Sequence, residues 1–205
     1  MRRKKEDSEQ TRLRILKAAQ EVFAKNGVSR TTQEQIAVAA GVTRGAIYWH
    51  FANKLEVFFA MREQISPIKE KGNIALLNPN MSDPLISIEQ FLSNLIDSLT
   101  TDEVANQILE ILIFKCEYVD GFEAILDEQA AHYAALSAKL TQVYEHAKDK
   151  NLLRPELTPK LAALDTQAFL IGIIRMWLLD KESKLIRNNI KDLIHAHITS
   201  RRSAN

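Results

Sequence analysis

Residues 31–54 read TTQEQIAVAAGVTRGAIYWHFANK, and this stretch decides how the first part of the chain folds. It contains two short runs of helical periodicity, each preceded by a threonine that can cap a helix, with a glycine where the chain turns between them. Thr32 and Thr43 are the capping threonines, and Gly41 is the glycine at the turn. Ala37 is a small residue where the two helices touch, and Ile47 is an apolar residue that points into the core. Their spacing predicts a helix-turn-helix, with helices over about 33–40 and 44–50.

Helical periodicity continues on both sides of this stretch and covers nearly the whole chain. The chain has 6 glycines and 5 prolines among 205 residues, and no segment alternates as a strand would. Gly27 is expected to end the first helix, and Asn53 to begin a long fourth helix that weakens near Pro67. Later helices are predicted from 84, over 102–116, over 120–149, over 158–179 and over 185–199. These patterns predict an all-α fold of about nine helices.

Charge is distributed unevenly although the net charge is only +1. Residues 1–60 carry 11 Lys and Arg against 6 Asp and Glu, whereas the rest of the chain carries 16 against 20. A basic first part is typical of a domain that binds a polyanion, and ordinary scatter in a small domain explains it equally well. We expect a loose basic arm at Arg2, Arg3, Lys4 and Lys5.

The remaining composition indicates a cytoplasmic protein. The single cysteine, Cys116, permits no disulfide within the chain and fits a reducing compartment. No apolar run follows the basic start, so we expect no secretory signal. No uninterrupted apolar stretch reaches the roughly 18 residues that span a bilayer, so we expect no membrane association.

The second helix of a helix-turn-helix enters the major groove by its N-terminal end. Arg44 at that end is expected to read guanine, while Gly45 allows close approach and Ala46 can touch a thymine methyl. The DNA phosphates are expected to bind to nearby hydroxyl, imidazole and ammonium groups and to the N-terminal ends of helices. The predicted DNA-binding residues are Thr32, Gln33, Thr43, Arg44, Gly45, Ala46, Tyr48, His50 and Lys54.

Each of these side chains also has a simpler interpretation. Tyr48 can be a core aromatic residue, His50 a surface histidine and Arg44 a solvated charge. For Trp49 the core interpretation is the one we prefer.

The run TTQEQIAVAAGVTRGAIYWHFANKLEVF closely resembles the N-terminal domain of TetR/AcrR-type transcriptional repressors. The preceding run RLRILKAAQEVFAKNGVSRTT resembles the first helix of that family and its lead-in, so the likeness covers about 50 residues. FKCEY at 114–118 and GIIRMWLL at 172–179 are similar to the branch that represses multidrug efflux pumps.

The resemblance implies an N-terminal three-helix helix-turn-helix domain over 1–54 and a helical ligand-binding and dimerisation domain over 55–205. It further implies a homodimeric repressor of a multidrug efflux operon, released from double-stranded operator DNA by a hydrophobic or aromatic inducer. In such a repressor, ligand binding would shift the long fourth helix and change the separation of the two DNA-reading helices.

Four later helices carry apolar stripes, and a packed core explains any single residue in them. The resemblance implies instead that they enclose an apolar cavity of broad specificity, with Tyr133, Gln167 and Arg175 as its polar groups. The predicted ligand-binding residues are Ile88, Phe91, Leu92, Leu95, Leu109, Ile113, Tyr133, Leu136, Leu140, Gln167, Leu170, Ile171, Ile174 and Arg175.

The run AFLIGIIRMWLL at 168–179 is apolar nearly all round, which predicts that it buries one face against a second copy of the chain. Gly172 would allow close approach and Trp177 would anchor the interface. A second interface stripe is predicted on the last helix at Ile190, Leu193, Ile194, His197 and Ile198. A two-fold dimer would present two reading helices to a pseudo-palindromic operator.

Other functions are less well supported by the sequence. No nucleophile elbow, phosphate-binding loop or paired-carboxylate motif is present, so we expect no enzyme activity, no cofactor and no metal. His195 and His197 are two residues apart on a helix and point in different directions, while Cys116 reads as a core thiol on an apolar stripe. A non-inducible DNA-binding architectural protein and an activator of the same fold stay open.

Overall fold

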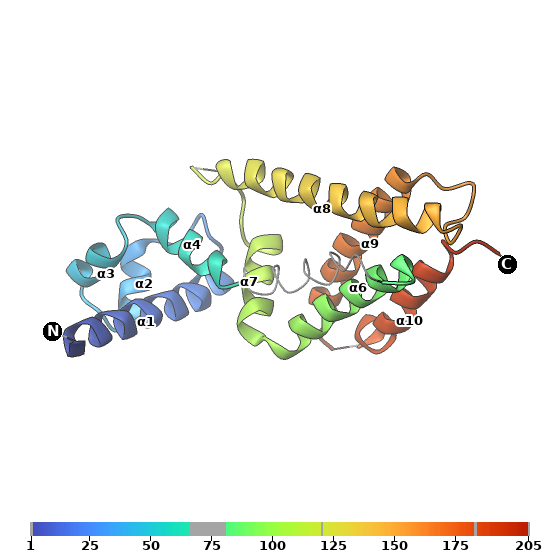
Figure 1. The fold of residues 1–205 in the computed structure, drawn as a ribbon. Helices are drawn as coiled ribbons and strands as arrows, with labels where there is room; N and C mark the ends of the chain where they lie inside the picture. The colour runs from blue at the N-terminus through green and yellow to red at the C-terminus, as the bar shows by residue number, and fades with distance from the viewer. Residues whose placement is uncertain (1, 66–80, 120, 183, 205) are drawn as a thin grey trace. The chain divides into compact units, whose positions relative to one another are not determined.

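The structure is a computed structural model, shown as a ribbon in Figure 1. It describes residues 2–65, 81–119, 121–182 and 184–204. Within these ranges the chain forms nine α-helices and one 3-10 helix, and its only strand-like pairing is an isolated bridge between Leu153 and Arg202. The predicted all-α fold is confirmed. By its contacts the chain divides into two compact units, residues 1–66 with 102–126 and residues 67–101 with 127–205.

The first unit contains the predicted helix-turn-helix. Its elements are α1 (Arg2–Asn26), α2 (Gln33–Ala39), α3 (Arg44–His50), α4 (Lys54–Arg62), the 3-10 helix η1 (Glu63–Ile65) and α7 (Glu103–Phe114). α1 packs against α2, α4 and α7, and α2 packs against α3. Phe58 lies at the centre of the core, with its ring edge-on to those of Phe23 and Phe122 at centroid distances of 5.9 and 5.2 Å. The predicted loose arm is wrong, because α1 is already helical from Arg2.

Local side-chain caps fix where the short helices begin. Thr32 forms a full capping box with Gln35, and Thr43 accepts a hydrogen bond from the backbone N–H of Ala46 at 3.1 Å. Asn53 caps α4 in the same way. Gly41 turns the chain with a φ of +64°, and a β-carbon there would meet no atom of the described residues within 4 Å. Backbone conformation rather than space therefore favours glycine at this turn.

The first unit is assembled from two stretches of chain that lie far apart in sequence. The Val28 N–H donates to the Lys115 carbonyl at 2.8 Å, and the Ser29 hydroxyl donates to the Glu117 carboxylate at 2.5 Å. These bonds fasten the segment after α7 to the turn after α1. The functional division between 1–54 and 55–205 stays a prediction, since compactness follows a different division.

The second unit contains α6 (Pro84–Thr101), most of α8 (Ala124–Asp149), α9 (Pro159–Leu179) and α10 (Leu185–Thr199). α10 packs against both α6 and α9. Pro84 begins α6 directly after Asp83, whose carboxylate accepts a hydrogen bond from the Leu85 N–H, and Thr158 caps α9, so both helices begin close to the predicted positions. The predicted long fourth helix is described only as α4 and η1; its continuation towards Pro67 and beyond lies outside the described residues.

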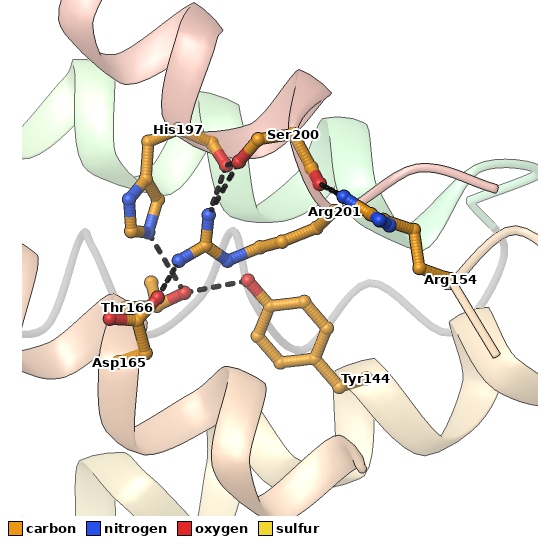
Figure 2. Close-up of polar contacts among 7 residues, drawn as sticks. All are labelled: Tyr144, Arg154, Asp165, Thr166, His197, Ser200 and Arg201. Carbon is orange, nitrogen blue, oxygen red and sulfur yellow. Dashed lines mark hydrogen bonds and ion pairs between the residues drawn. The ribbon is translucent and has the colours of Figure 1, made fainter. Parts of the chain in front are cut away.

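A polar network ties the end of the chain to α8 and α9, as Figure 2 shows. The Tyr144 hydroxyl and the Thr166 hydroxyl are 2.6 Å apart, and His197 Nε2 lies 3.2 Å from the same Thr166 oxygen. The buried Arg201 guanidinium donates to the His197 carbonyl and to Asp165. The His197 ring also stacks on Phe169 with 3.8 Å between centroids. The network fixes the C-terminal end of α10 inside the second unit.

Two predictions about the dimer interface are wrong in detail. Trp177 is only 2% exposed and lies under the Arg187 guanidinium, 4.2 Å from its ring centroid, so it is a core residue. Three isoleucines of the predicted interface stripe on α10 are buried within the chain: Ile190, Ile194 and Ile198. Periodicity correctly identified a buried stripe but could not say whether the same chain or a partner covers it.

α9 nevertheless leaves a large apolar surface outside. Five large apolar side chains at helical spacing form what we call the outer α9 face: Leu161, Leu164, Ile171, Met176 and Leu179. Gly172 lies beside them, and a β-carbon there would meet no described atom within 4 Å. By length and composition alone α9 could cross a membrane, a test that core helices of soluble proteins also pass, and only 44% of its most apolar window is buried.

Candidate nucleic-acid interface and sensor residues

The N-terminal end of α3 is exposed. Thr43, Arg44 and Gly45 are exposed at that end, and Tyr48 is exposed one turn later. Ala46 is half-buried behind them, while Ile47 is fully buried and holds α3 on the core. The predicted reading residues therefore share one accessible surface, with their helix anchored from behind.

Two predicted DNA-binding residues are engaged inside the unit. Gln33 is buried, and its side-chain amide donates to the Phe51 carbonyl at 2.6 Å. The Lys54 ammonium donates to the Val28 and Ser29 carbonyls at 2.8 and 3.0 Å. These bonds connect the ends of α3 and α4 to the rest of the unit. Thr32, by contrast, is exposed, although its hydroxyl also caps α2.

The interpretation of Trp49 as a core residue is wrong, because 72% of its surface is exposed. Ile47 takes the inward position of α3, and a residue two places later on a helix points away from it. The neighbouring His50 is half-buried and packs edge-on against the Trp49 ring at 4.5 Å. Burial, and then the nearby Arg12 cation, lower the pKa of His50, so the imidazole is neutral at neutral pH.

One residue of this surface was not predicted from the sequence: Glu34 in the first turn of α2. Its carboxylate accepts a hydrogen bond from the Tyr48 hydroxyl at 3.1 Å and pairs with the Arg44 guanidinium at 3.4 Å. The same guanidinium lies over the Tyr48 ring, 5.6 Å from its centroid. Three side chains from α2 and α3 thus form a connected group. No periodicity signals such a group, because its members come from different helices.

The predicted ligand-binding residues are distributed over both units. Leu109 and Ile113 lie half-buried on α7 of the first unit, and the other twelve belong to the second. In the second unit six of them are buried: Ile88, Phe91, Leu92, Leu140, Gln167 and Leu170. Four are half-buried: Leu95, Tyr133, Leu136 and Ile174. Ile171, which belongs to the outer α9 face, and Arg175, on the same side of α9, are exposed, so their position fits a partner better than an internal ligand.

Gln167 is the most informative of these residues. It is only 7% exposed, and its side-chain oxygen has no hydrogen-bond partner among the residues that the structure describes. A buried acceptor without a donor is costly, and such groups in native proteins call for an explanation, such as a bound ligand. Half-burial also raises the pKa of the Tyr133 phenol, which therefore stays a neutral hydroxyl at neutral pH.

Cys116 does not lie on the helical stripe to which the sequence analysis assigned it, because α7 ends at Phe114. The thiol is half-buried, and burial raises its pKa. A thiol with a raised pKa carries little thiolate at neutral pH and is a poor nucleophile.

Two family descriptions match the chain. "Bacterial regulatory proteins, tetR family" matches residues 15–61, and "MAATS-type transcriptional repressor, C-terminal region" matches residues 83–201. The first contains the helix-turn-helix, and the second covers more than half of the chain. Both parts of the sequence-based resemblance are therefore confirmed.

Relatives and solved structures extend over nearly the full length. The HTH-type transcriptional regulator TtgR of Pseudomonas putida is 36% identical over 183 residues, covering 89% of this chain and 87% of TtgR. NalD, the secondary repressor of the MexAB-OprM multidrug efflux pump in Pseudomonas aeruginosa, has a TM-score of 0.83 at 34% identity, covering 96% of this chain and 98% of NalD. SmeT in complex with triclosan has a TM-score of 0.76 at 26% identity, covering 93% and 91%.

The family match, the identity to full-length regulators and the exposed reading helix agree with one another. None of them indicates an enzyme. The chain belongs to the tetR family of bacterial regulatory proteins.

Proposed function

We propose that the chain represses a multidrug efflux operon and is released from its operator by a hydrophobic or aromatic small molecule. The observation that carries the DNA-binding part is the capped, exposed N-terminal end of α3, with Arg44 at its first position. The efflux operon is proposed because NalD is a repressor of an efflux pump and resembles this chain over nearly its whole length.

The proposed DNA contacts follow the exposure of the side chains. Arg44 reads a guanine edge, and Gly45 and Ala46 allow and add close contacts in the major groove. The phosphate contacts come from the more peripheral residues Thr32, Thr43, Tyr48 and His50. Gln33 and Lys54 contribute indirectly, because their hydrogen bonds hold α3 and the start of α4 in place.

The proposed inducer binds in the second unit near Gln167. The Gln167 oxygen, which has no partner in the described ranges, accepts a hydrogen bond from the ligand, and the buried residues Phe91, Leu140 and Leu170 supply apolar contacts. A site with few fixed polar groups discriminates mainly by size and hydrophobicity, so several compounds are expected to bind. The SmeT–triclosan complex shows that a related repressor binds an aromatic molecule.

The proposed active form is a homodimer in the cytoplasm. The outer α9 face is the proposed contact, because a single chain leaves it exposed. Two chains related by two-fold symmetry present two α3 helices to two half-sites. The inducer binds more tightly to a dimer whose α3 helices have the wrong separation for the operator. This difference in affinity shifts the population of dimers towards the form that does not bind DNA.

The first test measures binding of the purified protein to the DNA upstream of its own gene, at one salt concentration, with and without a panel of amphipathic drugs and dyes. We expect specific binding that at least one compound weakens. Arg44→Ala is expected to weaken it about tenfold or more, because a bidentate guanine contact is lost. Lys148→Ala, which removes an exposed cation of α8, is the matched control and is expected to change little.

The outcomes separate the alternatives. Specific binding that no compound changes favours a non-inducible architectural protein. Increased transcription from the bound promoter in a reconstituted assay favours an activator. An Arg44→Ala variant that binds as tightly as the wild type contradicts the proposed reading role of α3.

A further inference from the structure

The surface that reads DNA contains a carboxylate, which the proposed function does not explain. Glu34 has its side chain 46% exposed, beside the Arg44 guanidinium, which is 74% exposed. DNA presents a dense row of negative phosphates, so an acidic group on this surface opposes binding to every sequence. Because Glu34 weakens the non-specific electrostatic attraction to DNA, its presence on this surface calls for a contribution other than affinity.

The carboxylate is charged under ordinary conditions. Its own backbone N–H, then the Tyr48 hydroxyl, and further the Arg44 cation lower the pKa of Glu34. All three interactions favour the ionised form. The opposing charge therefore persists at neutral pH.

The contacts of Glu34 restrict the two side chains that are expected to meet DNA. The Arg44 guanidinium pairs with the carboxylate and also lies over the Tyr48 ring. The Tyr48 hydroxyl in turn donates a hydrogen bond to Glu34. A long arginine side chain loses rotamer freedom when it binds, and a side chain that is already ordered loses less.

We propose that Glu34 is a positioning residue that sets DNA specificity by orienting Arg44 and Tyr48 and by opposing non-specific attraction. This inference rests on the proposed reading role of α3. Where Arg44 meets guanine, the orientation supplied by Glu34 offsets the repulsion between its carboxylate and DNA. Where Arg44 meets another base, only the repulsion remains. Glu34 therefore increases the ratio of specific to non-specific affinity while lowering affinity for DNA in general.

The test begins by selecting DNA from a random-sequence library with the wild-type protein. The dissociation constants of the selected sequence and of a scrambled sequence are then measured at several salt concentrations. We expect Glu34→Gln to tighten binding to the scrambled sequence about threefold and to lower the specificity ratio about tenfold, the scale of one base contact. Glu21→Gln, which removes an exposed carboxylate of α1, is the control for charge alone and is expected to keep the ratio.

A second selection, performed with Glu34→Gln, separates orientation from charge. Loss of orientation is expected to relax preference at one base pair in each half-site, the pair read by Arg44. Loss of charge alone would tighten binding to all sequences equally and leave the selected bases unchanged. In an Arg44→Ala background, Glu34→Gln is expected to have no further effect on the ratio.

Three results would overturn the inference. The first is a specificity ratio of Glu34→Gln equal to that of the wild type. The second is a fall of both affinities together with the melting temperature, which would indicate that Glu34 only supports the fold of α2. The third is a wild-type protein that selects no sequence. That result removes the DNA-reading function itself, whereas the first two leave it intact and refute only the role of Glu34.

Discussion

Gln167 is a single residue whose proposed role in binding the inducer comes with a lower stability of the folded protein. Within the described part of the chain its buried oxygen lacks a partner, and an unsatisfied acceptor costs about 1–3 kcal/mol. We expect Gln167→Met to raise the free energy of unfolding by about 1 kcal/mol, and the melting temperature by roughly 2–4 °C, because the thioether fills similar space without an orphan acceptor. The same variant should respond less to inducers that carry N–H or O–H donors. Thermal unfolding and inducer titrations of the DNA complex measure both effects.

The exposed Gln142 of α8 provides the control, since Gln142→Met removes the same amide where water already solvates it. A drop in melting temperature specific to Gln167→Met would mean that the oxygen has a donor in the folded protein. That result would argue against a ligand contact there.

Individual residues also show which structural features could be predicted from the sequence and which could not. The caps at Thr32, Thr43 and Asn53 were predictable because each bonds to a backbone group within a few residues. The internal role of Lys54 was not, because its carbonyl partners are about 25 residues away. Trp49 was assigned wrongly because a helix of two turns gives too short a pattern to decide which aromatic side chain points inward.

At the scale of elements, the end of α10 is expected to make stability depend on pH. Burial, and then the Arg201 cation, lower the pKa of His197 to about 4, while Asp165 acts in the opposite direction. Tyr144, a further titratable group in the network, is connected to His197 through the Thr166 hydroxyl. Between the ordinary histidine pKa of about 6.5 and about 4, the unfolded chain binds a proton that the folded chain does not. His197 therefore contributes stability above that window and loses it as the pH falls through it.

We expect His197→Gln to flatten the fall in melting temperature between pH 6.5 and 4, compared with the wild type. His146→Gln, at an exposed position of α8, should leave the slope unchanged. NMR titration of the wild-type imidazole checks the same point without a substitution. A His197 resonance that titrates near 6.5 would contradict the prediction.

For the whole molecule, the outer α9 face is expected to decide the oligomeric state. Ile171 is 40% exposed and lies beside Gly172 on this face. We expect Ile171→Glu to give monomers in sedimentation analysis, because an interface cannot bury two unpaired carboxylates cheaply. DNA affinity should fall strongly as well, since a monomer reads only one half-site.

Val104→Glu places the same charge at an exposed apolar position of α7 and is expected to keep the dimer. Dimers of Ile171→Glu that are as stable as those of the wild type would place the interface elsewhere.

The whole fold was predictable because helices dominate the chain, with apolar periodicity along them and local side-chain caps at several of their starts. Which apolar faces pair was not predictable. The buried face of α10 and the exposed face of α9 look alike in sequence, and only their neighbours in the folded chain distinguish them. The resemblance of the helix-turn-helix to known repressors, rather than periodicity, supplied the function.

The two-part construction of the first unit bears on how this regulator can be recombined with others. Residues 102–126 supply Phe122 against Phe58 and the Lys115 carbonyl for Val28. A chimaera that grafts only residues 1–66 onto a foreign sensor would expose an aromatic face and leave a backbone donor unpaired. Recombination breakpoints should therefore be chosen in pairs, so that both stretches come from the same parent and the inherited specificity arrives on an intact scaffold.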